Sequence, residues 1–553
     1  MKSPTSLKCV QRVFLALAAA TGLSLMIACG SSNSANPNNN GFDATFLNGT
    51  YVFSTAGSDS TNGTLIALAG AFTADGKGGI SGGNMDAIDP AVGVSAGVSI
   101  TSGSYSVSSD GRGQAKLTSS AGTFTLRFVL TTAPAPSSHG LISEFDSIGT
   151  GSGTLDLQTA PTQSALAGPF AFSFAGSDST GNPFASAGAF TLNSSGTSTG
   201  GTVDFNRVIS GTQPTPSLGL GLSVSALLGS GTAPGTATFN SSYAPNATFD
   251  FYPIDSTHWK MIETDNTYFL AGDVYTQTGF STIPSGSFVF TLAGGTNNSG
   301  PISAGGYMTS SGSGNFPTGL EDVNITGNAT GSIPFLGTAA GAPGTGGRVL
   351  IGLNGFSPAI QWVAYPSSGG VLLMETDTVN LLTGSAVTQT STSFNAPDGY
   401  GLNLTGTNAN SAVDVIGQFN ATTATSPATN MTGVLDENDQ GTLYPGATLS
   451  GTYTPDSPAT GRGGISVTSN GGYQGGFTLE YYTIDASDAL FIDIDNTQVA
   501  VGTFEGQSGI TPAVAAASSG AGVAGAGVAA SSSHPFETVV HPFVKSKLAK
   551  KTK

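Results

Sequence analysis

The chain has 553 residues, of which 38% are hydrophobic and only 9% are charged, and its formal net charge is −17. This acidic balance argues against nucleic acid as a partner, because phosphate backbones are bound by Lys and Arg. The length allows several hydrophobic cores, and the few charges indicate a surface made largely of Ser, Thr, Asn and Gly.

Residues 1–28 have the pattern of a signal peptide. A basic start precedes the apolar stretch 13–27, which is shorter than a membrane-spanning helix. The stretch ends in Met26-Ile27-Ala28-Cys29-Gly30, which resembles the lipobox of bacterial lipoproteins. This resemblance implies cleavage before Cys29 and a diacylglyceryl group on its thiol. Met26 departs from the family pattern, which usually has Leu at that position.

The lipobox resemblance implies an exported protein that is lipid-anchored to the cell envelope. In this family a residue other than Asp after the modified cysteine permits passage to an outer membrane, and here that residue is Gly30. Removal of the signal peptide takes Cys9 with it and leaves Cys29 as the only cysteine. We therefore expect no intramolecular disulfide, no cysteine-based metal site and no cofactor. Residues 29–46, with the string GSSNSANPNNN, are expected to form a flexible tether.

Four copies of one module follow, about 115 residues apart. Each copy opens with an aromatic residue, an alternate apolar residue and a glycine. These opening sets are Tyr51, Phe53, Gly57; Phe170, Phe172, Gly176; Phe288, Phe290, Gly294; and Tyr400, Leu402, Gly406. The predicted module ranges are 47–159, 166–278, 284–390 and 396–508.

Two further signals repeat inside the modules. A glycine with an aromatic residue two positions later occurs as Gly70 and Phe72, Gly188 and Phe190, Gly305 and Tyr307, and Gly417 and Phe419. An aspartate three residues after a glycine occurs as Asp86, Asp204, Asp322 and Asp436. In three copies Asn follows two residues later, as Asn206, Asn324 and Asn438.

Each module closes with an acidic pair one residue apart, a glycine and a glutamine at fixed spacing. The closing sets are Glu144, Asp146, Gly153, Gln158; Glu263, Asp265, Gly272, Gln277; Glu375, Asp377, Gly384, Gln389; and Asp493, Asp495, Gly502, Gln507. Four residues held at fixed spacing in four copies indicate tandem domains of one kind.

Within a module, apolar residues alternate with Ser, Thr and Gly, and turn signals such as DGKGG and SDGRG recur at strand spacing. This pattern predicts an all-β fold with about eight antiparallel strands in each module. A meander of that size hides its edges by closing, so an up-and-down β-barrel is expected, similar in architecture to avidin and the lipocalins. A β-sandwich is the alternative.

The acidic pairs are the main candidate site. Residues i and i+2 of a strand point the same way, so the two carboxylates could bind calcium, with the Asp-x-Asn segment adding oxygens if the fold brings it near. The interpretation we prefer is structural: these acids cap turns or accept backbone hydrogen bonds. Glycosidase chemistry is disfavoured, because catalysis needs one distinct cleft and this motif occurs in every module.

Other chemistry-bearing residues are few. His139 and His258 are in different modules and are interpreted as surface or turn residues, so no Ser-His-Asp site is expected. Trp259 and Trp362 occupy non-equivalent positions, which favours core packing over stacking on sugars. The sequence therefore predicts no enzyme.

Residues 509–553 form an Ala, Gly and Ser-rich linker and a Lys-rich tail, interpreted as solubilising, with contact to anionic lipid or glycan as the alternative. The layout is similar to that of bacterial lipoproteins with tandem β-repeats of uncharacterised function. We expect a membrane-attached protein with a structural, adhesive or interaction role, whose partners are an envelope glycan or a protein. The alternative is a carrier that holds a small apolar ligand or a glycan inside its barrels.

Overall fold

The computed structural model describes most of residues 41–507, which include the end of the predicted tether, 41–46. Phe42 of this segment belongs to the buried core of barrel 1, so the segment is packed against the fold. The described residues are 41–159, 162–207, 215–224, 231–296, 300–312, 314–378, 380–393, 399–408, 411–422, 429–470 and 475–507. They form antiparallel β-sheets and three short 3₁₀ helices, and the sheets belong to one compact unit. No helix in these ranges is long and apolar enough to span a bilayer.

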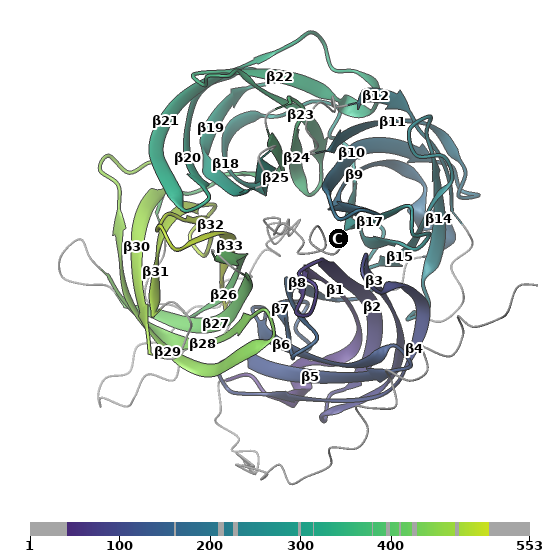
Figure 1. Ribbon diagram of the computed structural model, residues 1–553, viewed down its shortest axis with the longest axis vertical. Coiled ribbons are helices and arrows are strands. Elements are labelled where there is room, and N and C mark those ends of the chain that lie inside the picture. The colour runs from purple at the N-terminus through teal and green to yellow at the C-terminus, as the bar shows by residue number, and fades with distance from the viewer. Residues whose placement is uncertain are drawn as a thin grey trace, which may run out of the picture. The chain divides into compact units, whose positions relative to one another are not determined.

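Barrel 1 is a closed meander in which each strand pairs with the next and β8 pairs back with β1 (Figure 1). Its elements are η1 (Ala44–Phe46), β1 (Asn48–Asp59), β2 (Leu65–Asp75), β3 (Gly79–Asp89), β4 (Gly93–Val107), β5 (Arg112–Ser119), β6 (Gly122–Leu130), β7 (His139–Phe145) and β8 (Gly149–Leu157).

Barrel 2 is nearly closed, with two short strands where barrel 1 has the long β4. Its elements are η2 (Gln163–Leu166), β9 (Gly168–Asp178), β10 (Pro183–Leu192), β11 (Ser198–Arg207), β12 (Thr215–Gly219), β13 (Gly221–Val224), β14 (Gly235–Asn240), β15 (Ala247–Pro253), β16 (His258–Glu263) and β17 (Tyr268–Thr276). The two ends of this nine-stranded sheet, β12 and β13, are consecutive in the chain: β12 pairs with β11 at Thr202–Phe205, and Ser223 of β13 forms a bridge with Thr197, just before β11.

Barrels 3 and 4 repeat the closed eight-strand meander. Barrel 3 comprises β18 (Ser285–Thr296), β19 (Pro301–Ser311), β20 (Phe316–Ile325), β21 (Asn328–Ala339), η3 (Thr345–Gly347), β22 (Val349–Asn354), β23 (Ile360–Ser367), β24 (Gly370–Glu375) and β25 (Asn380–Thr388). Barrel 4 comprises β26 (Gly399–Asn408), β27 (Ala412–Thr422), β28 (Thr429–Asp439), β29 (Thr442–Pro455), β30 (Arg462–Ser469), β31 (Gly476–Thr483), β32 (Asp488–Asp493) and β33 (Gln498–Gly506).

These topologies confirm the all-β, tandem-barrel prediction, and the β-sandwich alternative is wrong. A sandwich would leave the first and last strands of each module in separate sheets. Instead, the strand that opens each module pairs with the one that closes it, as Tyr51 with Leu157 and Tyr400 with Gly506. The strands of barrels 1 to 4 lie within the four predicted module ranges.

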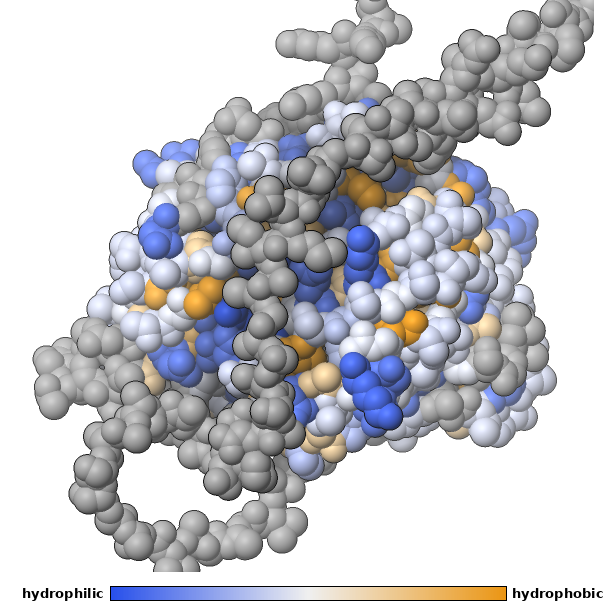
Figure 2. Space-filling view, turned by 90° about the horizontal axis from the view of Figure 1, so that it is seen from below, coloured by the Kyte–Doolittle hydropathy of each residue, from blue (hydrophilic) through white to orange (hydrophobic). Residues whose placement is uncertain are grey.

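Each barrel interior is filled by the alternate apolar residues of its strands. In barrel 1, Tyr51, Phe53 and Phe72 belong to one buried cluster, and each of the other barrels has a corresponding cluster of its own. The outside is polar but sparsely charged, so the face in Figure 2 is mainly white and blue with scattered orange spots. Each module therefore has its own core, as its alternating pattern requires.

The repeated glycines allow the first and last strands of each barrel to approach closely. A Cβ on Gly153 would lie 1.8 Å from the backbone oxygen of Ser54, and one on Gly57 would lie 1.8 Å from that of Thr150. The equivalent glycines of the other barrels are similarly crowded by backbone oxygens, at 1.8–2.4 Å. The opening and closing glycines are thus required where each barrel closes.

The strand register corrects one of the internal repeats. Phe53, Phe172 and Leu402 are paired with Gly70, Gly188 and Gly417, whereas their equivalent Phe290 is paired with Gly306. The equivalent pair in barrel 3 is therefore Gly306 and Met308, and the assignment to Gly305 and Tyr307 was wrong by one residue. Met308 belongs to the buried core of barrel 3.

Candidate functional site

The first acid of each closing pair is buried at the end of a strand. Glu144, Glu263, Glu375 and Asp493 are each 0% exposed. Burial, followed by the charge of the second acid, raises the pKa of all four carboxyl groups well above the usual range. Both carboxyl oxygens of Glu144 have no hydrogen-bond partner. These side chains are therefore favoured in the neutral, protonated form.

The second acid of each pair accepts backbone hydrogen bonds. Asp146 accepts from the N–H groups of Thr125 and Ile148, both at 2.8 Å. Asp265 accepts from Thr248 and Thr267 at 2.6 and 2.7 Å. Asp377 and Asp495 likewise accept from Gln361 and Thr497. Within the described ranges, no group of three or more His, Cys, Asp or Glu residues is placed to hold a metal ion.

The Asn of the Asp-x-Asn signal lies beside the acidic pair, but of the next barrel rather than its own. The Nδ2 of Asn324 donates to the backbone oxygens of Asp493, Asp495 and Gln498 at 2.9–3.2 Å. Asn206 donates in the same way to Glu375 and Asn380 of barrel 3. Asn438 of barrel 4 donates to Glu144, Asp146 and Gly149 of barrel 1. In each case the side-chain NH₂ group of the Asn donates to main-chain oxygens of the hairpin that carries the acidic pair.

The closing glutamines also contact the following barrel. Gln158 donates to the oxygen of Pro253 in barrel 2, Gln277 to Gly346 and Pro366 in barrel 3, and Gln389 to Thr460 and Thr483 in barrel 4. Gln507 donates to Asp110 and Leu130 of barrel 1, at 2.7 and 3.0 Å. The contacts of consecutive barrels therefore form a closed cycle. We call the contacts 1–2, 2–3, 3–4 and 4–1 the first to fourth joints.

The repeated aspartate binds a cation across three of the joints. Asp204 accepts two hydrogen bonds from Arg348 in the second joint, and Asp322 accepts two from Arg462 in the third. The hydroxyls of Tyr365 and Tyr482 donate to the same two carboxylates. In the fourth joint Arg127 lies 4.0 Å from Asp436. These Arg and Tyr residues were not predicted from the sequence, although Arg112, Arg348 and Arg462 each lie three residues before a buried residue at an equivalent strand position.

Apolar side chains complete the joints. The first joint buries Ile88 and Ala69 of barrel 1 against Tyr252, Ile262 and Phe269 of barrel 2. The other three joints have clusters of the same kind, of which the fourth is the smallest, with Val129, Leu141 and Ile416. The barrels are therefore packed against one another by apolar as well as polar contacts.

The interpretation of His139 as a surface or turn residue was wrong. His139 is buried in the fourth joint, with Nδ1 2.6 Å from Asp156 and Nε2 3.1 Å from Glu505 of barrel 4. Burial alone would lower the pKa of the imidazole, but Glu505 and Asp156 together raise it well above the usual value. The sequence could not reveal this contact, because His139 and Glu505 are 366 residues apart.

His258 has a similar structural environment in barrel 2. Its Nε2 lies 2.7 Å from Asp273, and its ring stacks on Tyr275 with the centroids 4.4 Å apart. Asp273 also pairs with the buried ammonium group of Lys260 at 2.7 Å. The pKa of Asp273 is lowered because Lys260 and His258 outweigh the effect of its burial.

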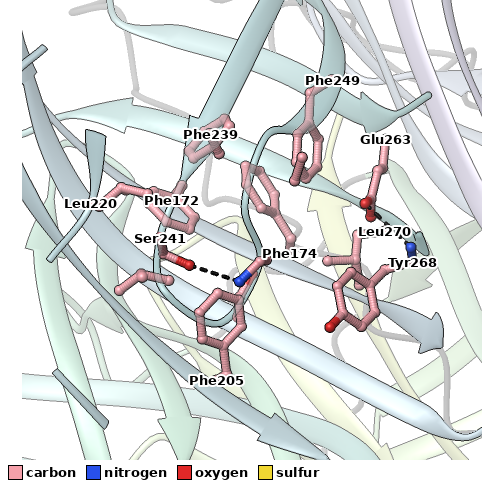
Figure 3. Close-up of a pocket in the computed structure, with 14 residues that line it drawn as sticks. Phe172, Phe174, Phe205, Leu220, Phe239, Ser241, Phe249, Glu263, Tyr268 and Leu270 are labelled. Carbon is pink, nitrogen blue, oxygen red and sulfur yellow. Dashed lines mark hydrogen bonds between the residues drawn. The ribbon is translucent and has the colours of Figure 1, made fainter. Parts of the chain in front are cut away.

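Both tryptophans pack in barrel interiors. Trp259 lies in the core of barrel 2 and Trp362 in that of barrel 3, and each is in contact with phenylalanines. Barrel 2 also has a partly open cavity of about 20 Å³, lined by five Phe and other mostly apolar side chains together with Ser241, Glu263 and Tyr268 (Figure 3). One water molecule needs about 10–15 Å³, whereas ligand pockets are usually hundreds of Å³.

Comparison with known proteins gives no family assignment: no family model matches the chain, and no curated protein is similar to it. Cys29, the predicted lipidation site, lies outside the described residues.

Proposed function

We propose that this protein is an exported lipoprotein, anchored to the cell envelope through Cys29, whose four barrels act together as a non-catalytic structural or interaction unit. One observation carries the second part of the proposal. The repeated polar side chains, Asp, Asn and Gln, form hydrogen bonds that join barrel to barrel. A repeat used in this way favours assembly over chemistry.

The barrel interiors support the same proposal. Aromatic and aliphatic side chains form a buried cluster inside each of them, and the cavity in barrel 2, at about 20 Å³, is far smaller than a usual ligand pocket. This favours the structural role over the carrier role. The partners we propose are the membrane, through the N-terminal lipid, and an envelope glycan or protein at the outer surface. The acidic balance favours such partners over nucleic acid.

Metabolic labelling with a fatty acid tests the anchor. Wild-type chain should incorporate the label and fractionate with the outer membrane, whereas Cys29→Ser should incorporate no label and should keep its signal peptide, because cleavage follows lipidation of the cysteine. Cys9→Ser is the matched control and should behave as wild type, because the signal peptide is removed before Cys29. Label retained by Cys29→Ser would refute the anchor. Enzymatic turnover of an envelope glycan by the purified chain would refute the non-catalytic role.

A further inference from the structure

The first joint lacks two polar contacts that the other joints have. Pro234 of barrel 2 is equivalent in position to Arg348 of barrel 3 and Arg462 of barrel 4. Each lies three residues before a buried core residue of the strand equivalent to β5, which is β14 in barrel 2. Ile88 of barrel 1 occupies the position of Asn206, Asn324 and Asn438, two residues after the repeated aspartate. Ile88 is fully buried in the apolar cluster of this joint. The first joint therefore has neither the guanidinium nor the amide.

In their place, two carboxyl groups face each other. Asp86 of β3 is 0% exposed and Asp250 of β15 is 8% exposed. Asp250 is equivalent in position to Arg127 of barrel 1, because each is paired with the residue immediately before the first acid of the closing pair. Asp250 and Tyr252 are two residues apart on β15, so their side chains leave the strand on the same side, and the hydroxyl of Tyr252 donates to Asp86. The Asp250 carboxyl is therefore directed toward that of Asp86, where one proton between the two groups would remove their repulsion. Burial and the charge of Asp250 raise the pKa of Asp86 to about 7.

The other groups around Asp86 do not supply a positive charge. Tyr252 Oη donates to Asp86 at 2.6 Å from β15, and the backbone N–H of Gly97 donates from β4. Thr236 Oγ1 of β14 donates to Asp250 at 2.9 Å. Among the described residues, Asp250 and Tyr252 are the titratable groups that shift the pKa of Asp86. When both Asp86 and Asp250 are ionised, the described residues supply no cation to neutralise the second negative charge. Asp204 and Asp322, in contrast, are each paired with an arginine.

We propose that the first joint is a pH-sensitive contact, held by a proton shared between Asp86 and Asp250, which loosens barrel 1 from barrel 2 as the pH rises from acidic to neutral. Asp86 binds its proton more tightly in the closed joint than in an open, hydrated one. The closed joint is thus fully favoured below about pH 4 and is weakened up to the pKa of about 7, where the effect levels off. The opening equilibrium should increase by up to about tenfold for each pH unit in this window.

Thiol labelling of a buried joint position measures this opening directly. In the full chain carrying Cys9→Ser and Cys29→Ser, Ala69→Cys places the single thiol in the first joint, and Ala187→Cys places it in the second. Both alanines are 0% exposed, and they pair with Asp86 and Asp204 at the same register position. Labelling rates are divided by those of the urea-unfolded chain at each pH, which removes the intrinsic titration of the thiol. Between pH 5 and pH 7 the normalised rate for Ala69→Cys should increase by tenfold to a hundredfold, and that for Ala187→Cys should stay constant.

Two further variants test the carboxyl pair itself. Asp250→Asn removes the second charge, and Pro234→Arg restores the cation of the equivalent joints, so either change should abolish the pH response of Ala69→Cys. Asp255→Asn, on a nearby turn of the same barrel, removes one charge without touching the pair and should keep the response. Equal pH responses at Ala69→Cys and Ala187→Cys would overturn the proposal. So would a response that persists in both Asp250→Asn and Pro234→Arg, even if one of these variants is destabilised.

Discussion

Arg462 should contribute more to stability than any surface ion pair of this protein. Its guanidinium donates to Asp322 at 2.8 and 2.9 Å, to Asp456 at 2.9 Å, and lies 3.0 Å from Glu480. The Arg462 side chain is 11% exposed and that of Asp322 is 0% exposed. Arg462→Met would keep most of the packing but leave Asp322 charged and buried. Breaking such a pair costs about 3–5 kcal/mol.

The hydroxyl of Tyr482 continues to donate to Asp322 at 2.6 Å in this variant, so the loss should fall near the lower end, about 3 kcal/mol. Arg112→Met is the matched control, because Arg112 has the equivalent position in barrel 1. Arg112 pairs only with Asp110 in the ion pairs of the described chain, and these side chains are 24% and 31% exposed. A pair this exposed contributes about 0–1 kcal/mol.

Urea unfolding of the full chain, followed by circular dichroism, gives the two free-energy changes under identical conditions. Combining Arg462→Met with Asp322→Asn should recover part of the lost stability, because the fully buried carboxylate of Asp322 is then no longer left without its cation. The reasoning fails if Arg462→Met and Arg112→Met destabilise equally, or if the double variant is less stable than Arg462→Met alone.

Three further predictions concern a closing glycine, a buried glutamate and calcium. Gly153→Ala should lower the melting temperature strongly, since its Cβ would collide with a backbone oxygen at 1.8 Å, whereas Gly464→Ala, with nothing within 4 Å, should not; similar shifts would contradict this account of the glycines. Glu321 is fully buried, and burial raises its pKa to about 8, so its favourable effect on stability, complete below about pH 4.5, is lost as the pH rises through 8. Glu321→Gln should therefore gain in melting temperature relative to wild type from pH 5 to pH 8, and a constant difference would disprove the assignment. Millimolar calcium should leave the melting temperature unchanged; an increase that is lost in the Glu263→Gln and Asp265→Asn double variant would instead show a calcium site.

The barrels could be predicted because their determinants are local. Alternation along a strand, turn residues between strands and a period of about 115 residues are all visible within one module. The choice of a barrel over a sandwich rested on the need of a meander of about eight strands to hide its two edge strands, which closure achieves. Gly305 was misassigned because Gly306 is adjacent to it, and only the register distinguishes them.

The joints could not be predicted, because their partners are in different modules. The spacing of Gln277 indicates that it is needed, but not that its amide reaches the oxygens of Gly346 and Pro366. In the same way, the Asp-x-Asn signal was considered as a source of oxygen ligands for the acidic pair of its own module. The structure brings Asn324 to an acidic pair, but to that of the following barrel and as a hydrogen-bond donor. The sequence indicated which side chains are needed, but not which barrel each of them contacts.

Closure of the cycle has a consequence for the order in which the chain assembles during synthesis and export. Barrels 1, 2 and 3 can each pack against the following barrel as soon as that barrel has been synthesised. The other face of barrel 1, with His139, Val129 and Leu141, can be covered only after strands near the C-terminus have been made. The contact of His139 with Glu505 spans 366 residues, so that apolar and charged face stays exposed to water while three more barrels are made and translocated. A chain that stopped before β33 would never cover it. Such a product would carry a permanently open surface, which exposes incomplete molecules to aggregation and to proteolysis in the envelope.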